Sequence, residues 1–169
     1  MTEHEKQHEF VSLVKAHERL ILKVCSMYSS CRWGDLQDRY QEAVCALWKA
    51  YDSYRGESKI STWIYAVCRY TMINLMRQHK DGDCVVSLED INEPAADSAD
   101  NALLDELREA LSKLPPQDRD LFVMWMEGFK NDEIAQVLDL KVGTVAVRLT
   151  RLKMRLRKMM KRETHGGKL

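Results

Sequence analysis

Long hydrophobic runs are missing from this chain of 169 residues. No apolar stretch approaches the roughly 18 residues that a membrane-spanning helix requires. The first six residues, MTEHEK, contain no apolar core of the kind found in a secretory signal. We therefore expect neither a membrane span nor secretion, and the sequence predicts a cytoplasmic protein.

Proline and glycine are also scarce, with three prolines and seven glycines. Fibrous and disordered sequences are rich in one or both residues, so these classes are excluded. With 45% hydrophobic and 31% charged residues, the composition is typical of a helix-rich globular protein. The length allows one domain or two small ones and excludes a large multidomain enzyme.

The five cysteines form no recognisable site. They are odd in number, no two are spaced as Cys-x-x-Cys, and no histidines cluster near them, so neither a zinc site nor any other metal or cofactor is expected. An unpaired cysteine behaves as a small hydrophobic residue, which predicts reduced and mostly buried thiols. A thiol switch between Cys25 and Cys31 is left open by the sequence without being supported by it.

The chain has no net charge, because 26 Lys and Arg balance 26 Asp and Glu. The balance fails locally. Residues 81–113 carry ten acidic and two basic side chains, whereas residues 141–169 carry ten basic and one acidic. Such asymmetry is typical of a nucleic-acid-binding end next to an acidic segment.

Hydrophobic periodicity predicts three helices in the first 80 residues. Apolar residues recur at helical spacing in three segments, which are Phe10–Val24, Leu36–Tyr51 and Ile64–Met76. The first segment is predicted as one continuous helix. Asp35 is placed to cap the second and Ser61 to cap the third. Together they predict a helical domain over residues 5–80.

Between Asp81 and Asp100 the periodicity disappears, and seven acidic residues take over. Like charges favour an extended chain, so residues 81–101 are predicted to form an acidic linker. A second helical domain is predicted over residues 102–162, with a tail at 163–169. The predicted fold class is all-α, with two small helical domains.

The second domain ends in a helix-turn-helix pattern. Residues 131–138 have the apolar spacing of a short helix, a turn containing Gly143 follows, and Thr144 is placed to cap a long basic helix. In a helix-turn-helix the second helix enters the major groove of DNA. Its predicted core face comprises Val145, Leu149, Leu152 and Leu156, and a separate basic face comprises Arg148, Arg151, Arg155, Lys158 and Arg162, widened by Lys153, Arg157 and Lys161.

A run of basic residues is ordinarily a solvated helix face. Here ten basic side chains against one acidic side chain would repel one another unless an anion compensates them. The phosphates of DNA are the obvious anion.

The third predicted helix carries a second stripe of residues besides its core face. These are Trp63, Ala66, Tyr70, Ile73 and Arg77. One interpretation is that the aromatic rings complete a small core. The other is a platform on which unpaired bases stack while basic side chains neutralise the backbone.

Two groups of motifs, in order along the chain, resemble the extracytoplasmic-function (ECF) group of RNA polymerase sigma factors. The segments DLQDRYQE (35–42), LWKA (47–50) and YRGESKISTWIY (54–65) are similar to the second conserved region of that group. Leu114-Pro115, Gly128, EIA (133–135), Leu138 and VGTV (142–145) with Arg148-Leu149 and Arg151 resemble the fourth region. The resemblance covers about residues 8–80 and 103–160.

This resemblance implies an alternative sigma factor rather than an enzyme, with core RNA polymerase and promoter DNA as partners and no small-molecule substrate. Docking on the clamp helices of the largest polymerase subunit is implied for Asp38, Gln41, Glu42 and Trp48. Capture and melting of the −10 element is implied for Arg55, Ser58, Lys59, Ser61, Trp63, Arg69, Tyr70, Asn74 and Arg77. Reading of the −35 element as duplex is implied for Thr144, Ala146, Val147, Arg148, Thr150, Arg151 and Arg155. An anti-sigma factor is a further partner that this group commonly has.

Several residues depart from the family pattern. Ala66 and Tyr70 stand where a basic residue and Asn are common, and Ala146 and Val147 where a basic residue and Ser are common. The −10 and −35 preferences of the family therefore do not transfer, and apolar contact of Ala146 or Val147 with thymine methyl groups becomes an alternative.

The sequence also leaves two other classes of protein to be considered. A free-standing helix-turn-helix regulator would bind duplex operator DNA without polymerase. An enzyme is the weakest candidate, because the sequence has no Gly-rich phosphate loop, no metal-ligand cluster and no nucleophile with a plausible base.

Overall fold

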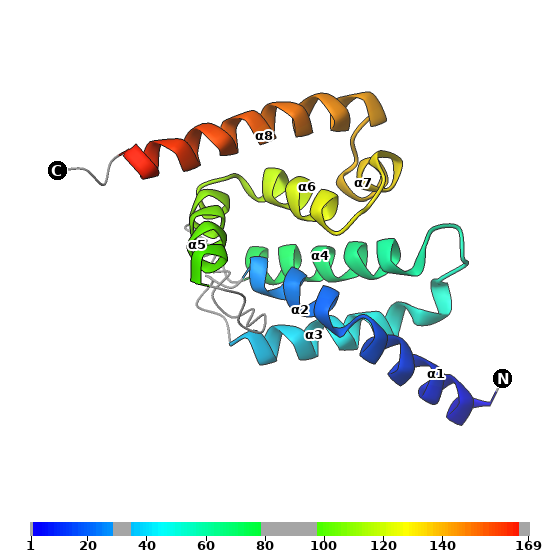
Figure 1. Ribbon diagram of the computed structural model, residues 1–169. Helices are drawn as coiled ribbons and strands as arrows, with labels where there is room; N and C mark the ends of the chain where they lie inside the picture. The colour runs from blue at the N-terminus through cyan, green and yellow to red at the C-terminus, as the bar shows by residue number, and fades with distance from the viewer. Residues whose placement is uncertain (1, 29–34, 79–97, 166–169) are drawn as a thin grey trace. The chain divides into compact units, whose positions relative to one another are not determined.

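The computed structural model describes residues 2–28, 35–78 and 98–165, and all regular structure in those ranges is helical (Figure 1). The all-α prediction is confirmed. The elements are α1 (Glu3–Ala16), α2 (Glu18–Met27), α3 (Leu36–Ala50), the short 3₁₀ helix η1 (Tyr51–Ser53), α4 (Ile60–Gln78), α5 (Ser98–Ser112), α6 (Pro116–Met126), α7 (Asn131–Leu138) and α8 (Val142–His165). None of the described helices is both long enough and apolar enough to cross a membrane.

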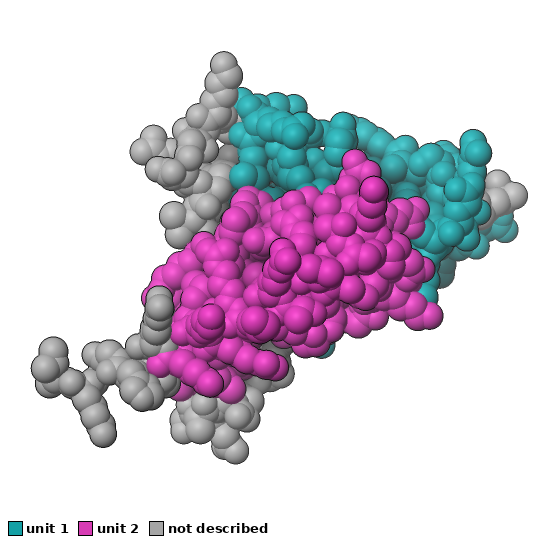
Figure 2. Space-filling model, turned by 90° about the horizontal axis from the view of Figure 1, so that it is seen from above, with its two compact units in different colours: residues 1–91 teal, residues 92–169 magenta. Residues whose placement is uncertain are grey.

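The chain divides into two compact units, residues 1–91 and 92–169 (Figure 2). α5 begins at Ser98, inside the predicted linker, and α8 continues to His165, past the predicted start of the tail. Most of the predicted linker, together with Cys31 and Cys84, lies outside the described residues.

Unit 1 is built on α2, α3 and α4, which pack on one another. Its most deeply buried core side chains, at most 1% exposed, include Ile21, Val24, Leu47, Ile64, Tyr65 and Met72. α3 begins with a capping box in which the Asp35 carboxylate accepts the Asp38 N–H (3.0 Å) and the Asp38 carboxylate accepts the Asp35 N–H (3.2 Å). The predicted N-cap at Asp35 is therefore confirmed.

The prediction of one continuous first helix was wrong. The chain turns at His17, whose φ of −116° and ψ of 15° end α1 and precede α2. Phe10 of α1 packs against Trp48 and Tyr51, whereas Ile21 is fully buried in the core that α2 forms with α3 and α4. Both packing sites are occupied because the helix breaks between them, so tertiary contacts override the continuous periodicity.

The predicted N-caps at Ser61 and Thr144 were also wrong. α4 begins at Ile60 and α8 at Val142, so both hydroxyl residues lie inside the first helical turn. The carbonyl of Lys59 accepts the Trp63 N–H and that of Lys141 accepts the Val145 N–H, each at 3.1 Å.

In unit 2, α8 packs against α5, α6 and α7. The predicted core face of α8 is confirmed, since Val145, Leu149, Leu152 and Leu156 are at most 6% exposed. Pro116 occupies the first turn of α6, where backbone N–H groups have no partner within the helix, so its missing N–H costs no hydrogen bond.

Two left-handed residues end helices in this unit. Gly128 (φ 82°) follows α6, and Asp139 (φ 53°) ends α7. Asp adopts this conformation more readily than most residues do, so the turn tolerates the absence of glycine at that position. The turn joins α7 to α8 as the helix-turn-helix.

Candidate nucleic-acid interface

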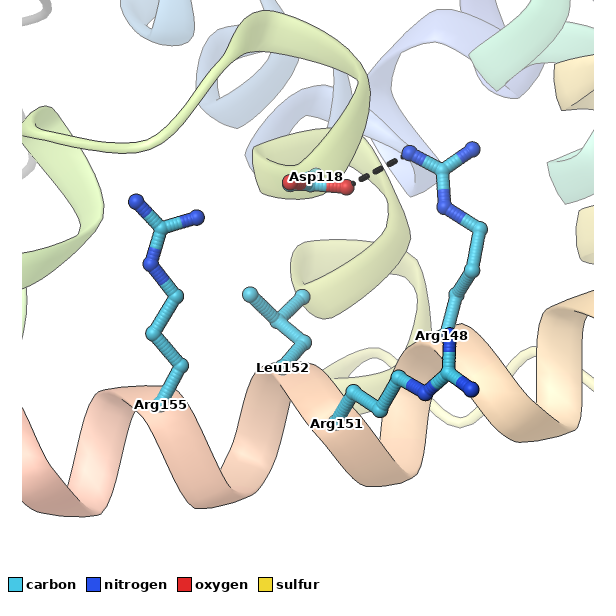
Figure 3. Close-up of a pocket in the computed structure, with 5 residues that line it drawn as sticks. All are labelled: Asp118, Arg148, Arg151, Leu152 and Arg155. Carbon is cyan, nitrogen blue, oxygen red and sulfur yellow. Dashed lines mark hydrogen bonds and ion pairs between the residues drawn. The ribbon is translucent and has the colours of Figure 1, made fainter.

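Three arginines of α8 line an open hollow of about 190 Å³ together with Asp118 of α6 and Leu152 (Figure 3). They are Arg148, Arg151 and Arg155, at the i, i+3, i+7 spacing of one helix face. Figure 3 shows Arg148 and Arg155 extending from α8 toward α6. The hollow contains three cationic side chains and one carboxylate, so it favours an anion.

The three arginines are in different situations. Arg148 donates to the Asp118 carboxylate at 2.7 Å and to the Gln117 side-chain oxygen at 3.0 Å, and its side chain is 32% exposed. Arg151 and Arg155 are exposed and have no acidic partner within the described residues. Of the three, only Arg148 is held by the protein itself.

Lys153 was predicted to widen the basic face, but it is engaged within unit 2. Its ammonium lies 3.5 Å from the centre of the Trp125 ring. Trp125 packs in turn against Phe122, with ring centroids 5.5 Å apart. A cation over an indole face is stabilised by the ring quadrupole, so Lys153 joins α8 to α6.

Most of the residues predicted to read the −35 element lie on the exposed surface of α8. Thr144, Ala146, Val147, Thr150, Arg151 and Arg155 are exposed, and Arg148 is half-buried. The hydroxyl of Thr150 donates to the carbonyl of Ala146 at 3.0 Å.

In unit 1, the loop between η1 and α4 is anchored by Tyr54. Its hydroxyl donates to the carbonyl of Ser58 at 2.6 Å, and its ring lies 5.2 Å from that of Trp63. Gly56 turns the loop with φ 73°. Arg55 and Lys59, whose side chains are exposed, belong to this loop, and Lys59 directly precedes α4.

The second stripe of α4, which begins at Trp63, was interpreted either as part of a small core or as a platform for unpaired bases, and its residues divide between the two. Trp63 is half-buried against Tyr54, as a core residue would be, whereas Tyr70 is 67% exposed. The remaining residues predicted to bind the −10 element follow the same helix: Ser61, Arg69 and Asn74 are half-buried and Arg77 is exposed.

The residues predicted to dock on polymerase lie on α3. Asp38, Gln41 and Glu42 are exposed. Trp48 instead packs edge-on against Phe10 (4.9 Å) and stacks on Tyr51 (6.4 Å), so it has a structural role of its own.

Sequence reasoning missed the partners of this aromatic cluster. The Lys6 ammonium lies 4.8 Å from the centre of the Trp48 ring and 2.7 Å from the Asp52 carboxylate, whose hydrogen bond raises the pKa of Lys6. Lys6 and Asp52 are 46 positions apart, so no local pattern connects them. The aromatic residues Phe10, Trp48 and Tyr51 were the feature of the sequence that could have indicated this cluster.

Two of the cysteines are buried as predicted. Burial raises the pKa of the Cys25 thiol to about 12 and also raises that of Cys68, so both remain neutral at physiological pH. Cys45 is exposed, so among the described residues the thiols are mostly but not all buried, as predicted.

Comparison with known proteins decides the family. Residues 13–81 match sigma-70 region 2, and residues 104–156 match sigma-70, region 4. The chain is 30% identical over 165 residues to the ECF RNA polymerase sigma-E factor of Escherichia coli (strain K12), a match that covers 86% of this chain and 83% of that one. The chain belongs to the ECF sigma factors. It is an alternative sigma factor, which directs RNA polymerase to initiate transcription.

Further comparisons agree on the fold of this sigma factor. It is 24% identical over 157 residues to the sigma-E factor of Haemophilus influenzae, covering 84% of this chain and 82% of that one. CnrH, solved in complex with the cytosolic domain of CnrY, superposes with a TM-score of 0.65 at 21% identity, covering 92% and 89% of the two chains. RpoE from Bartonella quintana, solved with the anti-sigma factor NepR, gives a TM-score of 0.67 at 21% identity, covering 93% and 97%.

Proposed function

We propose that unit 2 of this sigma factor binds the −35 element as duplex through α8. The observation that carries this proposal is the pair of exposed arginines, Arg151 and Arg155, that have no acidic partner within the described residues. Unpaired guanidinium groups on the second helix of a helix-turn-helix are suited to the phosphates that flank the major groove. The other contact residues are Thr144, Ala146, Val147 and Thr150, and Arg148 acts by holding α8 on α6.

Unit 1 captures the −10 element as single strand. Tyr70 supports this role, because an aromatic ring that is 67% exposed adds little to a core and is suited to stacking on an unpaired base. The contact set comprises Arg55, Ser58, Lys59, Ser61, Trp63, Arg69, Asn74 and Arg77 in addition to Tyr70.

The exposed face of α3 binds the clamp helices of the largest polymerase subunit. Gln41 and Glu42 support this role directly, since both are exposed. Asp38 contributes from the capping box, and Trp48 contributes the half-buried edge of the aromatic cluster.

These roles follow the predicted division of the chain, with residues 5–80 as the domain for polymerase and the −10 element, 81–101 as linker, 102–162 as the −35 domain and 163–169 as tail. The protein acts in the cytoplasm and performs no catalysis of its own. An anti-sigma factor is its further partner, a proposal supported by the NepR complex of the similar RpoE.

Binding to core RNA polymerase at low salt tests the assignment. The full chain is expected to co-purify with core enzyme and to support run-off transcription. Glu42→Ala should lower core affinity by about tenfold, roughly 1.4 kcal/mol. Glu9→Ala, which removes an exposed glutamate from α1, should not change it.

Two outcomes would count against the proposal. A chain that binds duplex operator tightly but never binds core enzyme would be a free-standing helix-turn-helix regulator. Equal core affinities of the two alanine variants would show that α3 is not the docking face.

A further inference from the structure

The exposed surface of the first half of α8 is rich in methyl groups. Ala146, Val147 and Thr150 are all exposed, and Val147 is 50% exposed. These residues stand at i, i+1 and i+4, so they share one side of the helix. A valine that is half exposed on a helix expected to enter the major groove leaves much of its apolar surface available to a partner.

Three hydrogen-bond donors of the first half of α8 are engaged within unit 2 or within the helix itself. The guanidinium of Arg148 donates hydrogen bonds to Asp118 and Gln117, and the ammonium of Lys153 lies over the ring of Trp125. The hydroxyl proton of Thr150 is donated to the carbonyl of Ala146, so the group that Thr150 presents outward without further cost is its methyl. Reading guanine requires donors aimed at its O6 and N7, and these three side chains do not supply them.

Cationic side chains border the methyl-rich surface. Arg151, Arg155 and Lys158 are exposed along α8, and Lys141 is exposed just before the helix begins. This charge indicates that the surface meets a polyanion rather than an apolar protein face. In the major groove of duplex DNA, the apolar group that distinguishes one base from the others is the C5-methyl of thymine.

We infer that α8 recognises thymine by contact of Ala146, Val147 and Thr150 with its C5-methyl group. This inference rests on the proposed function, because it assumes that α8 enters the major groove. It assigns base selection to apolar contacts and leaves Arg151 and Arg155 to the phosphates.

The test uses the full chain bound to core RNA polymerase and two pools of duplexes with a randomised window. One pool contains thymine and the other contains deoxyuridine, which lacks only the methyl group. Rounds of selection on the first pool should enrich thymine at fixed positions, and selection on the second pool should not enrich uracil there. In the best single duplex, each replacement of a selected thymine by uracil should weaken binding about three- to fivefold, as expected for one buried methyl-sized group.

Val147→Ser provides the protein side of the test, because serine and valine have similar helix propensities while serine lacks the two methyl groups. The variant should bind the thymine duplex as weakly as the parent binds its uracil counterpart, and it should no longer distinguish the two at one position. Leu103→Ala is the matched control, since Leu103 is an exposed hydrophobic residue on α5 (56% exposed). It should retain the full preference for thymine.

The outcomes separate the inference from the proposed function. Sequence-specific binding of thymine and uracil duplexes with equal affinity overturns the inference and leaves the −35 role of α8 intact. Failure of the complex to bind any duplex through α8 overturns the proposed function itself. A thymine preference that survives in Val147→Ser at every selected position also overturns the inference, because the methyl groups of Val147 would then play no part in it.

Discussion

Arg148 of α8 and Asp118 of α6 form an ion pair of 2.7 Å that joins the recognition helix to the helix before the helix-turn-helix. The side chains are 32% and 19% exposed, so water screens the pair only in part. Gln117 accepts a second hydrogen bond from the same guanidinium at 3.0 Å. The bridge constrains the rotation of α8 relative to α6, and with it the residues that α8 exposes.

Replacing Arg148 by alanine should lower the free energy of unfolding by about 1 kcal/mol, because Asp118 then lacks its charged partner. Urea denaturation measures the effect, with Arg155→Ala as the control that leaves unfolding unchanged. Duplex binding should weaken at all sequences alike. Unchanged unfolding together with relaxed preference at a single base pair would instead identify Arg148 as a base-reading residue.

Arg151→Ala and Arg155→Ala should each reduce the salt dependence of duplex binding. A phosphate contact releases condensed counterions, so each lost contact should lower the slope of log K against log salt by about 0.9. Fluorescence anisotropy over a salt series measures this slope. Arg108→Ala is the control, because Arg108 lies on α5 and pairs with Asp105, and it should leave the slope unchanged. If both α8 variants kept the parental slope, Arg151 and Arg155 would not contact phosphates.

Tyr70→Ala should weaken binding of the −10 single strand by about 1–3 kcal/mol through loss of base stacking. Because Tyr70 is 67% exposed, the unfolding midpoint should change little. Binding of a non-template-strand oligonucleotide by the polymerase complex measures the effect. Tyr70→Phe keeps the ring and should retain affinity; a loss as large as that of alanine would point to the hydroxyl rather than to stacking.

Alkaline pH should destabilise unit 1 through its buried thiols. Burial raises the pKa of Cys25 from 9.0 to about 12, so above pH 9 the unfolded chain releases a proton that the folded chain retains. The contribution to stability is complete below pH 9 and is lost progressively as the pH rises toward 12.

Thermal melting between pH 8 and about pH 11 measures this loss. Cys68 and Tyr40, whose pKa values burial also raises, act in the same direction, so a comparison with Cys25→Ala isolates the first thiol. The variant should show a shallower decline, and the exposed Cys45→Ala a parental one. If the melting temperatures of the parent and Cys25→Ala declined in parallel with pH, the raised pKa of the buried Cys25 thiol would be contradicted.

Local patterns were sufficient for much of the fold. The core face of α8 and the cap at Asp35 both depend on nearest neighbours along the chain, and the structure confirms them. The break at His17 did not follow from such patterns, because Phe10 and Ile21 keep helical spacing although they pack in different places.

The candidate site shows the same division. Sequence grouped the arginines of α8 by spacing, and the structure places Arg148, Arg151 and Arg155 on one hollow. Spacing did not reveal that Asp118, 30 positions earlier, holds one of them. Likewise nothing near Lys153 in the sequence indicated its position over Trp125.

The sequence by itself determined the all-α class and the family, because periodicity and motifs are properties of short stretches of chain. Tertiary structure alone decided which charged side chains remain available to a partner. Ion pairs and cation–π contacts form between residues distant in sequence, so packing removes Arg148 and Lys153 from the basic face and leaves Arg151, Arg155 and a methyl-rich surface around Val147.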